Sequence, residues 1–186
     1  MRMRIPLLLG ALAVLAAVVS FEAAPARAEK AATIENNSRA ALTLLKENSE
    51  GARRLAGDAS AILVFPKIVK GGLIIGGQYG EGALFKNDAV SQYYSTAAAS
   101  FGLQAGLQTF GYAVFFLDAS AESYLDSSDG WEIGTAPNVV VVESGAGTSL
   151  TTTSAKENIY VFFFDQKGLM AGLTIEGTKI TQINPD

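Results

Sequence analysis

The polar stretch between residues 31 and 56 repeats apolar positions with a helical period. One stripe of period 3.6 carries Ile34, Ala41, Leu45, Ala52 and Leu55. Asn48, Ser49 and Gly51 interrupt it, which predicts two short helices or one helix with a bend. We expect the apolar face to pack on a core. The alternative is an amphipathic helix lying on a membrane, but the polar face lacks the lysine-rich character of such helices.

After residue 58 the pattern becomes that of strands. β-branched and aromatic runs, separated by glycine, predict strands at 61–65, 72–86, 109–117, 138–144, 158–165 and 170–183. Segment 91–107 is ambiguous, and we interpret it as a strand. Turn signals lie at 126–130, 145–147 and 166–168. Residues 118–125 predict one short helix that begins at Asp118 or Ser120.

Glycine occupies much of one face of the predicted strand 72–86. Alternation places one set of side chains together, namely Leu73, Ile75, Tyr79, Ala83 and Phe85. The opposite face carries Ile74, Gly76, Gln78, Gly80, Gly82 and Leu84. A nearly bare face lets another element come close or lets the strand bend sharply. We therefore predict one α+β domain, with N-terminal helices packed on a strongly curved, mostly antiparallel, glycine-rich sheet that is either open or barrel-like.

The first 28 residues have the pattern of an export signal. Arg2 and Arg4 precede an apolar run over 5–19, and the segment 26–28 reads Ala-Arg-Ala, a small-x-small cleavage pattern. The alternative is an uncleaved N-terminal anchor. We expect residues 29–186 to form a single domain that is exported and is either periplasmic or associated with the cell envelope.

The charge of the chain is acidic and disfavours polyanionic partners. The formal net charge is −4, and leaving out the three arginines and one glutamate of residues 1–28 changes it to −6. A field of this sign argues against nucleic acid as a partner and against non-specific adsorption to an anionic membrane. Any contact with lipid or phosphate must therefore be local.

The composition excludes several kinds of catalytic and metal site. The chain has no histidine and no cysteine, so it has no disulfide, no Ser-His-Asp or Cys-His nucleophile and no zinc site built from those ligands. The glycines at 71–82 fit neither nucleotide-binding spacing. Asp126, Asp129 and Glu132 do not have the spacing of a calcium loop and are interpreted as a polar surface turn. We predict no enzymatic activity, no cofactor and no metal.

Four motifs in order resemble the SYLF domain. They are Ala61-Ile62-Leu63-Val64-Phe65-Pro66, Gly76-Gly77-Gln78-Tyr79-Gly80-Glu81-Gly82, Phe101-Gly102-Leu103-Gln104-Ala105-Gly106 and Lys167-Gly168-Leu169-Met170-Ala171-Gly172-Leu173-Thr174-Ile175-Glu176-Gly177. The similarity runs from about residue 40 to residue 183. The family occurs as single domains in exported bacterial proteins and is joined to SH3 or FYVE modules in eukaryotic actin regulators.

The resemblance implies a module that binds phospholipid, with phosphoinositide and actin binding in the eukaryotic members. An exported bacterial protein would not meet actin, so we do not expect actin as a partner, and any protein partner is unknown. The family pattern usually carries a glycine-proline and a basic residue in the stretch corresponding to 143–149. This chain has Glu-Ser-Gly-Ala-Gly-Thr-Ser there, so a headgroup contact from that basic residue would be missing.

Within this resemblance, residues 62–86 correspond to the signature strand pair. We expect a turn at Pro66 and Lys67, a reversal at Gly71 and Gly72, and a tip formed by Lys67, Ile68, Val69 and Lys70. Two cations around two apolar side chains could enter a headgroup layer, each cation contributing about 1 kcal/mol near an anionic surface. The alternative is an ordinary loop whose lysines stay in water.

Two classes of function therefore remain open from the sequence. The first is a non-enzymatic phospholipid-binding module that contacts the membrane peripherally through the 66–72 segment. The second is a structural or protein-interaction domain of the periplasm without a lipid ligand, which would hold its partner by a sheet edge or by the N-terminal helices.

Overall fold

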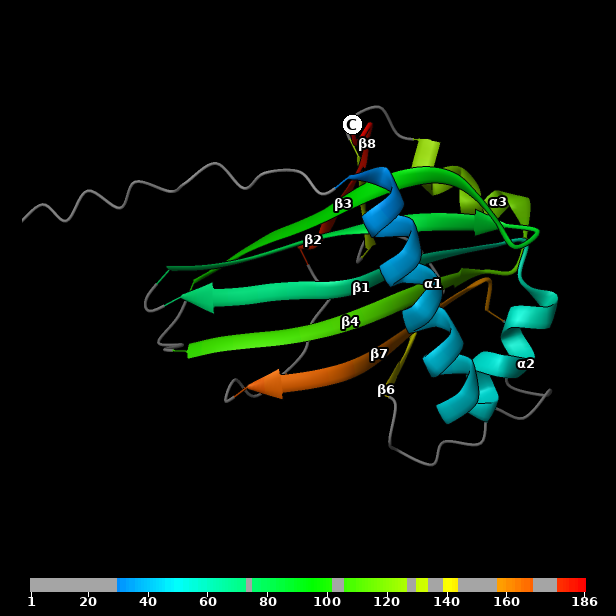
Figure 1. The fold of residues 1–186 in the computed structure, drawn as a ribbon, viewed down its shortest axis with the longest axis horizontal. Helices are drawn as coiled ribbons and strands as arrows, with labels where there is room; N and C mark the ends of the chain where they lie inside the picture. Colours follow the sequence, from blue (N-terminus) through cyan, green and yellow to red (C-terminus); the bar gives the residue numbers. More distant parts are fainter. Residues whose placement is uncertain are drawn as a thin grey trace, which may run out of the picture.

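The computed structural model describes residues 30–72, 75–101, 106–126, 130–133, 139–143, 157–168 and 177–186. The helical segments are α1 (Ala31–Asn48), α2 (Glu50–Asp58), α3 (Ala119–Glu122) and the 3-10 segment η1 (Ser123–Asp126). The strands are β1 (Ala61–Gly72), β2 (Ile75–Lys86), β3 (Ala89–Phe101), β4 (Gly106–Phe116), β5 (Trp131–Glu132), β6 (Val139–Glu143), β7 (Ile159–Gly168) and β8 (Lys179–Ile183) (Figure 1).

The N-terminal segment forms two helices that meet at Ser49. This residue is extended, and its hydroxyl accepts a hydrogen bond from the Ala52 amide at 3.2 Å. The hydroxyl thus satisfies one of the free amides at the start of α2, as an N-cap does. The interruption seen in the apolar stripe at 48–51 is therefore this cap, and of the two predicted alternatives the structure has two helices, the first of them 18 residues long.

Helices α1 and α2 cover one face of the sheet, which we call the outer face (Figure 1). The buried side chains of Ile34 and Leu45 pack there against strand residues such as Val64 and Phe115. The Ser38 hydroxyl, also buried, donates to the Val64 carbonyl at 3.2 Å. The apolar face of α1 is therefore a core face, and the alternative of a membrane-lying helix is wrong for this surface.

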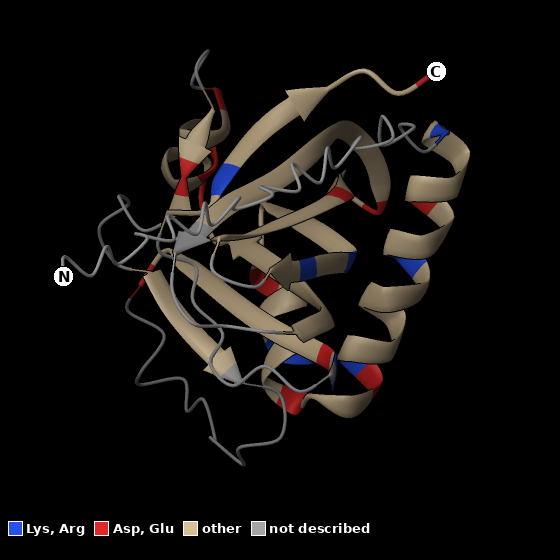
Figure 2. Cartoon of the chain, turned by 90° about the vertical axis from the view of Figure 1, so that its left-hand side faces the viewer, with Lys and Arg blue, Asp and Glu red and all other residues tan. Residues whose placement is uncertain are grey.

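The eight strands form one sheet in the order β5-β8-β3-β2-β1-β4-β7-β6. All pairs are antiparallel except β6 with β7. Seen end-on, the sheet curls away from α1 (Figure 2). The predicted α+β class, with N-terminal helices on a strongly curved and mostly antiparallel sheet, is confirmed.

The curl brings distant strands together on the second, inner face. The hydroxyls of Thr96 on β3 and Tyr112 on β4 lie 2.7 Å apart, although β2 and β1 run between them. Three strand spacings span about 14 Å in a flat sheet, so the contact requires strong curvature. Glycine permits it, because a Cβ at Gly80 would lie 2.8 Å from Ile68 Cγ1 and one at Gly82 would lie 2.7 Å from Phe65 Cδ1.

Strand β1 contains a bulge where a turn was predicted. Val64 pairs with Ala83 and Lys67 with Glu81, so β1 has one more residue than β2 between these pairs, and the same excess occurs opposite β4. The predicted turn at Pro66 and Lys67 is therefore wrong. Proline lacks the amide that a central strand needs, and a bulge accommodates it without ending the strand. Strand β1 continues to Gly72, and its antiparallel partner β2 begins at Ile75.

Most other predicted elements are present with shifted ends. Of the ambiguous segment 91–107, residues 91–101 belong to β3 and residues 106–107 begin β4, while the short helix at 118–125 is α3 with η1, capped by Asp118. The strand predicted at 170–183 corresponds to β8, while its first part lies outside the described residues. The predicted export signal at 1–28 also lies outside them, as does most of the 143–149 stretch.

Candidate functional site

The tetrad Lys67-Ile68-Val69-Lys70 lies within strand β1 and does not form a loop tip. Lys67 and Val69 are exposed, whereas Ile68 is fully buried and Lys70 retains 7 % of its surface. Successive side chains of a strand point to opposite faces, and Ile68 belongs to the inner-face core. The four residues therefore divide between two surfaces. The prediction that these four residues form one apolar tip carrying both lysines is therefore wrong. Lipid binding by these residues stays a prediction.

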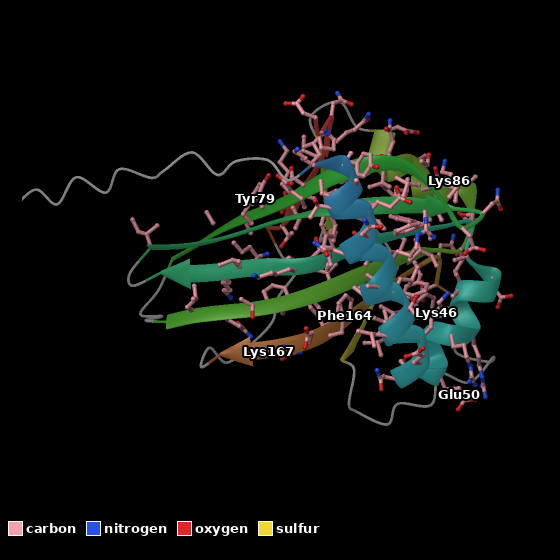
Figure 3. The ribbon with its side chains drawn as sticks, viewed as in Figure 1. Lys46, Glu50, Tyr79, Lys86, Phe164 and Lys167 are labelled. Carbon is pink, nitrogen blue, oxygen red and sulfur yellow. The ribbon has the colours of Figure 1, made fainter. Side chains whose placement is uncertain are left out.

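An exposed apolar patch lies on the outer face at the end of the sheet that α1 does not cover (Figures 1 and 3). We call it the tip patch; its members, with their exposed fractions, are Val69 (42 %), Ile75 (67 %), Tyr79 (43 %) and Leu107 (64 %). Val69 pairs directly with Tyr79, and Leu107 pairs with Gly71, where a Cβ would lie 3.3 Å from Leu107 Cδ1. Three adjacent strands thus present apolar side chains to one uncovered surface.

Charged residues border the tip patch. Lys67 lies one row farther along β1 and is paired in register with Glu81. Lys167, paired in register with Thr109, lies at the β7 side and forms an exposed ion pair with Asp165 at 3.1 Å (Figure 3). The local border therefore carries both signs of charge, in contrast to the acidic net charge of the chain.

The phenol of Tyr79 is held by the acid beside it. Its hydroxyl donates to Glu81 Oε1 at 2.6 Å. Burial, that hydrogen bond and the charge of Glu81 raise the pKa of Tyr79 to about 12. The ring therefore stays uncharged at neutral pH, with an apolar body and one polar end, the character that suits a water–apolar boundary.

The inner face at the same end of the sheet carries polar residues. This inner-face polar cluster consists of Lys70, Gln78, Gln108 and Thr178. Lys70 pairs in register with Gln78 on one side and Gln108 on the other. Gln78 Nε2 donates to Thr178 Oγ1 at 3.2 Å, but the buried Oε1 of Gln108 has no hydrogen-bond partner. This end of the inner face thus carries a largely buried lysine residue beside an unsatisfied amide oxygen.

The described part of the chain shows neither a metal cluster nor a membrane-crossing helix. No group of three acidic residues in the described ranges is arranged to hold a metal ion. Within those same ranges, every helix falls short of the length and apolar character needed to cross a bilayer.

The sequence did not indicate most of these residues, for two reasons. The bulge changes the count of alternating positions in β1, so Lys70 joins the inner face with Ile68 while Lys67 does not. Leu107 and Gln108 lie in a segment whose period was ambiguous. Ile75 and Tyr79 carried a usable signal, since alternation already placed them on one face.

A small α+β half-barrel with an uncovered apolar patch and a buried polar cluster has the features of a binding domain. Residues 97–185 match the family model described as Ysc84, Las17-binding protein actin regulator. The match extends from within β3 through β8, and it confirms the resemblance to the SYLF family inferred from the motifs. No curated protein matches the chain.

Proposed function

We propose that the protein is a non-enzymatic phospholipid-binding module of the cell envelope that contacts the membrane surface through the tip patch. The observation that carries the proposal is the gathering of four exposed apolar side chains from β1, β2 and β4 on one helix-free surface. Contiguous apolar surface of this kind is uncommon on a protein that binds nothing. The family match supports a binding role.

The chemistry of the patch suits shallow insertion. Ile75 and Leu107 are the most exposed members and would enter the acyl boundary, and burying such a side chain contributes roughly 1.5–3 kcal/mol. Tyr79 would keep its hydroxyl at the headgroup level, as tyrosines do at membrane interfaces. Lys67 and Lys167 would meet headgroup phosphates at the border, each contributing about 1 kcal/mol.

Of the tetrad predicted from the sequence, this proposal keeps Lys67 and Val69 at the membrane. It assigns no membrane contact to Ile68 and Lys70, because both side chains are buried on the inner face. The exported location rests on the predicted signal at residues 1–28.

Co-sedimentation with phospholipid vesicles tests the proposal. The chain beginning at Glu29 is mixed with vesicles of neutral lipid and of neutral plus anionic lipid, at low and high salt. Ile75→Ser and Leu107→Ser should each weaken binding about tenfold at any salt, because apolar insertion is not screened. Lys67→Glu should weaken binding to anionic vesicles at low salt only.

Leu44→Ser is the matched control, because Leu44 is similarly exposed but lies on α1, away from the tip patch. Equal losses for Leu44→Ser and Leu107→Ser would contradict a specific patch. Absence of binding to every vesicle would reject the lipid proposal. The same patch would then be tested as the docking surface of a protein partner.

A further inference from the structure

The outer face around the tip patch is apolar over four adjacent strands. From the row of Val69 to the end of the sheet, the described residues of β3, β2, β1 and β4 place no charged side chain on this face. Gly71 and Gly77 join the tip patch there, as do the exposed Ala97 and Ala99. The solvated face of an antiparallel sheet is normally polar, so this face has the composition of one that packs on another layer.

Protruding and flat positions lie side by side on this face. Gly71 pairs in register with both Gly77 and Leu107, so two positions without a side chain lie in one row with a leucine. A Cβ at Gly77 would meet, among the described atoms, only the Ala98 carbonyl oxygen at 3.6 Å, so the space above it is open. A surface that carries both protrusions and flat positions can fit a second copy of itself, as a two-fold contact requires.

The charges at the border of this face balance one another. Lys67 is paired in register with Glu81, and Lys167 forms its ion pair with Asp165. The acidic net charge of the chain therefore does not extend to this border. Two copies can approach each other here without the repulsion that a border of one sign would cause.

Helix α1 limits how a second copy can be oriented. It stands on the outer face of the same sheet, and β2, β1 and β4 continue past it to the tip patch (Figure 1). A helix is about 10 Å thick, as much as the spacing of two packed sheets. Two copies aligned side by side would therefore collide at α1. Their bodies must extend in opposite directions, with only the uncovered ends overlapping, which places a two-fold axis across the strands.

We propose that two copies of this chain pack against each other in solution through the tip patch, around a two-fold axis that follows the row of Gly71 and Gly77. The strands of the two copies run antiparallel in this contact, with the sheets about 10 Å apart. Tyr79 of each copy lies over Ile75 of the other, and the two Leu107 side chains meet each other. The glycines leave the space that these side chains fill.

The contact is small, which makes the dimer a weak one. Four strands and three rows of outward-facing residues measure roughly 14 Å by 13 Å. This footprint is smaller than the surface of about 800 Å² that each partner contributes to a stable interface. The dimer is therefore in equilibrium with the single chain.

Pairing of two copies would also regulate the proposed membrane contact, because both contacts use the tip patch. This consequence rests on the proposed function, whereas the dimer itself does not. The experiments on the dimer contain no lipid, so absence of vesicle binding would reject the proposed function without bearing on them.

Sedimentation velocity of the chain beginning at Glu29, which contains every described helix and strand, tests the pairing. The protein concentration is raised from about 10 μM to about 1 mM, the range in which weak complexes form. The weight-average mass should rise from that of one copy toward that of two, and no higher, because a two-fold contact is closed. A constant mass of one copy would overturn the proposal, as would growth beyond two copies.

Charge reversal at Gly77 tests the position of the axis. The two Gly77 positions face each other, so Gly77→Glu and Gly77→Lys should each weaken self-association at least about tenfold, whereas an equimolar mixture of the two variants should associate again. The open space at Gly77 lets both variants fold. Gly57→Glu on α2 is the control and should associate as the parent chain does, because a Cβ there also meets nothing within 4 Å. Undiminished association of Gly77→Glu, or a mixture that stays monomeric, would overturn the proposal.

Disulfide cross-linking gives a second readout, since the chain has no cysteine of its own. Leu107→Cys should form a covalent dimer on treatment with the thiol oxidant diamide, because the two Leu107 positions meet across the axis. Leu44→Cys is the matched control, as Leu44 is similarly exposed but lies on α1. Equal cross-linking of the two variants would contradict the proposed contact.

Discussion

Gly82 lies beneath the aromatic ring of Phe65 on the inner face. A Cβ at this position would collide with the Val64 carbonyl and lie 2.7 Å from Phe65 Cδ1, and the carbonyl belongs to the rigid ladder. Gly82→Ala should therefore destabilise the domain by about 2–3 kcal/mol, which urea unfolding measures. Gly57→Ala is the control, because its Cβ would meet nothing within 4 Å and alanine favours helix α2. A mild effect at Gly82 would contradict the close approach.

Tyr79, a member of the tip patch, makes the stability of the domain depend on pH in the alkaline range. Its pKa is about 12 in the folded chain and 10.0 in the reference state, so the unfolded state loses the proton first. The stabilising contribution is full below about pH 10 and is lost as the pH rises toward 12. Burial also raises the pKa of Tyr112, which acts in the same direction.

The free energy of unfolding should therefore fall from about pH 10 upward. In Tyr79→Phe the fall should be shallower, because Tyr112 still contributes while the phenol at position 79 is gone. Urea unfolding at a series of pH values measures both slopes. Identical slopes for the two proteins would show that Tyr79 is not perturbed as described.

Helix α1 packs on the sheet through a narrow stripe of buried side chains. Substitutions at two consecutive leucines test this packing. Leu45 is almost fully buried against the outer face, while Leu44 is 58 % exposed. Leu45→Ala should cost about 2–5 kcal/mol, as large cavities in a core do. Leu44→Ala makes the same change in helix propensity and should alter stability by less than about 0.5 kcal/mol. Chemical denaturation gives both values, and similar losses would mean that α1 docks differently.

For the helices and strands, the sequence predicted the features that depend on the local periodicity of apolar residues. It missed the features that depend on how neighbouring strands pair. The stripe of Ile34 and Leu45 specified α1, and the glycine-bearing face of β2 indicated curvature. The bulge in β1 has no local signature beyond Pro66, which equally suits a turn. The extra residue of the bulge determines which face of the sheet Lys67 and Lys70 each occupy. Only the registers with β2 and β4 reveal that residue.

The whole molecule has two ends of different character. At one end both faces of the sheet are buried, by α1 and α2 on the outer side and by the inner core. At the tip, the outer face is uncovered and the inner face is polar. Binding surfaces commonly occupy the less stable parts of a domain, and both proposed contacts lie at this end.

Hydrogen exchange of backbone amides should differ between the two ends of the sheet. Backbone amides of Leu63 and Val114, which lie between two buried layers, should exchange only through global unfolding. Amides of Val69 and Gln78 are in the same ladders but should exchange at least tenfold faster, through local opening of the tip. Uniform protection along β1 would contradict a separable tip.

The bulge at Pro66 also governs which changes in chain length relatives of this protein can tolerate. Loss of one residue at the bulge would restore a regular ladder and leave every downstream side chain of β1 on its present face. Gain or loss of one residue elsewhere in the strand would exchange the faces, turning Lys70 outward and Val69 inward. Single-residue insertions and deletions in β1 should therefore be confined to this position, where an alignment of homologues would place its gap.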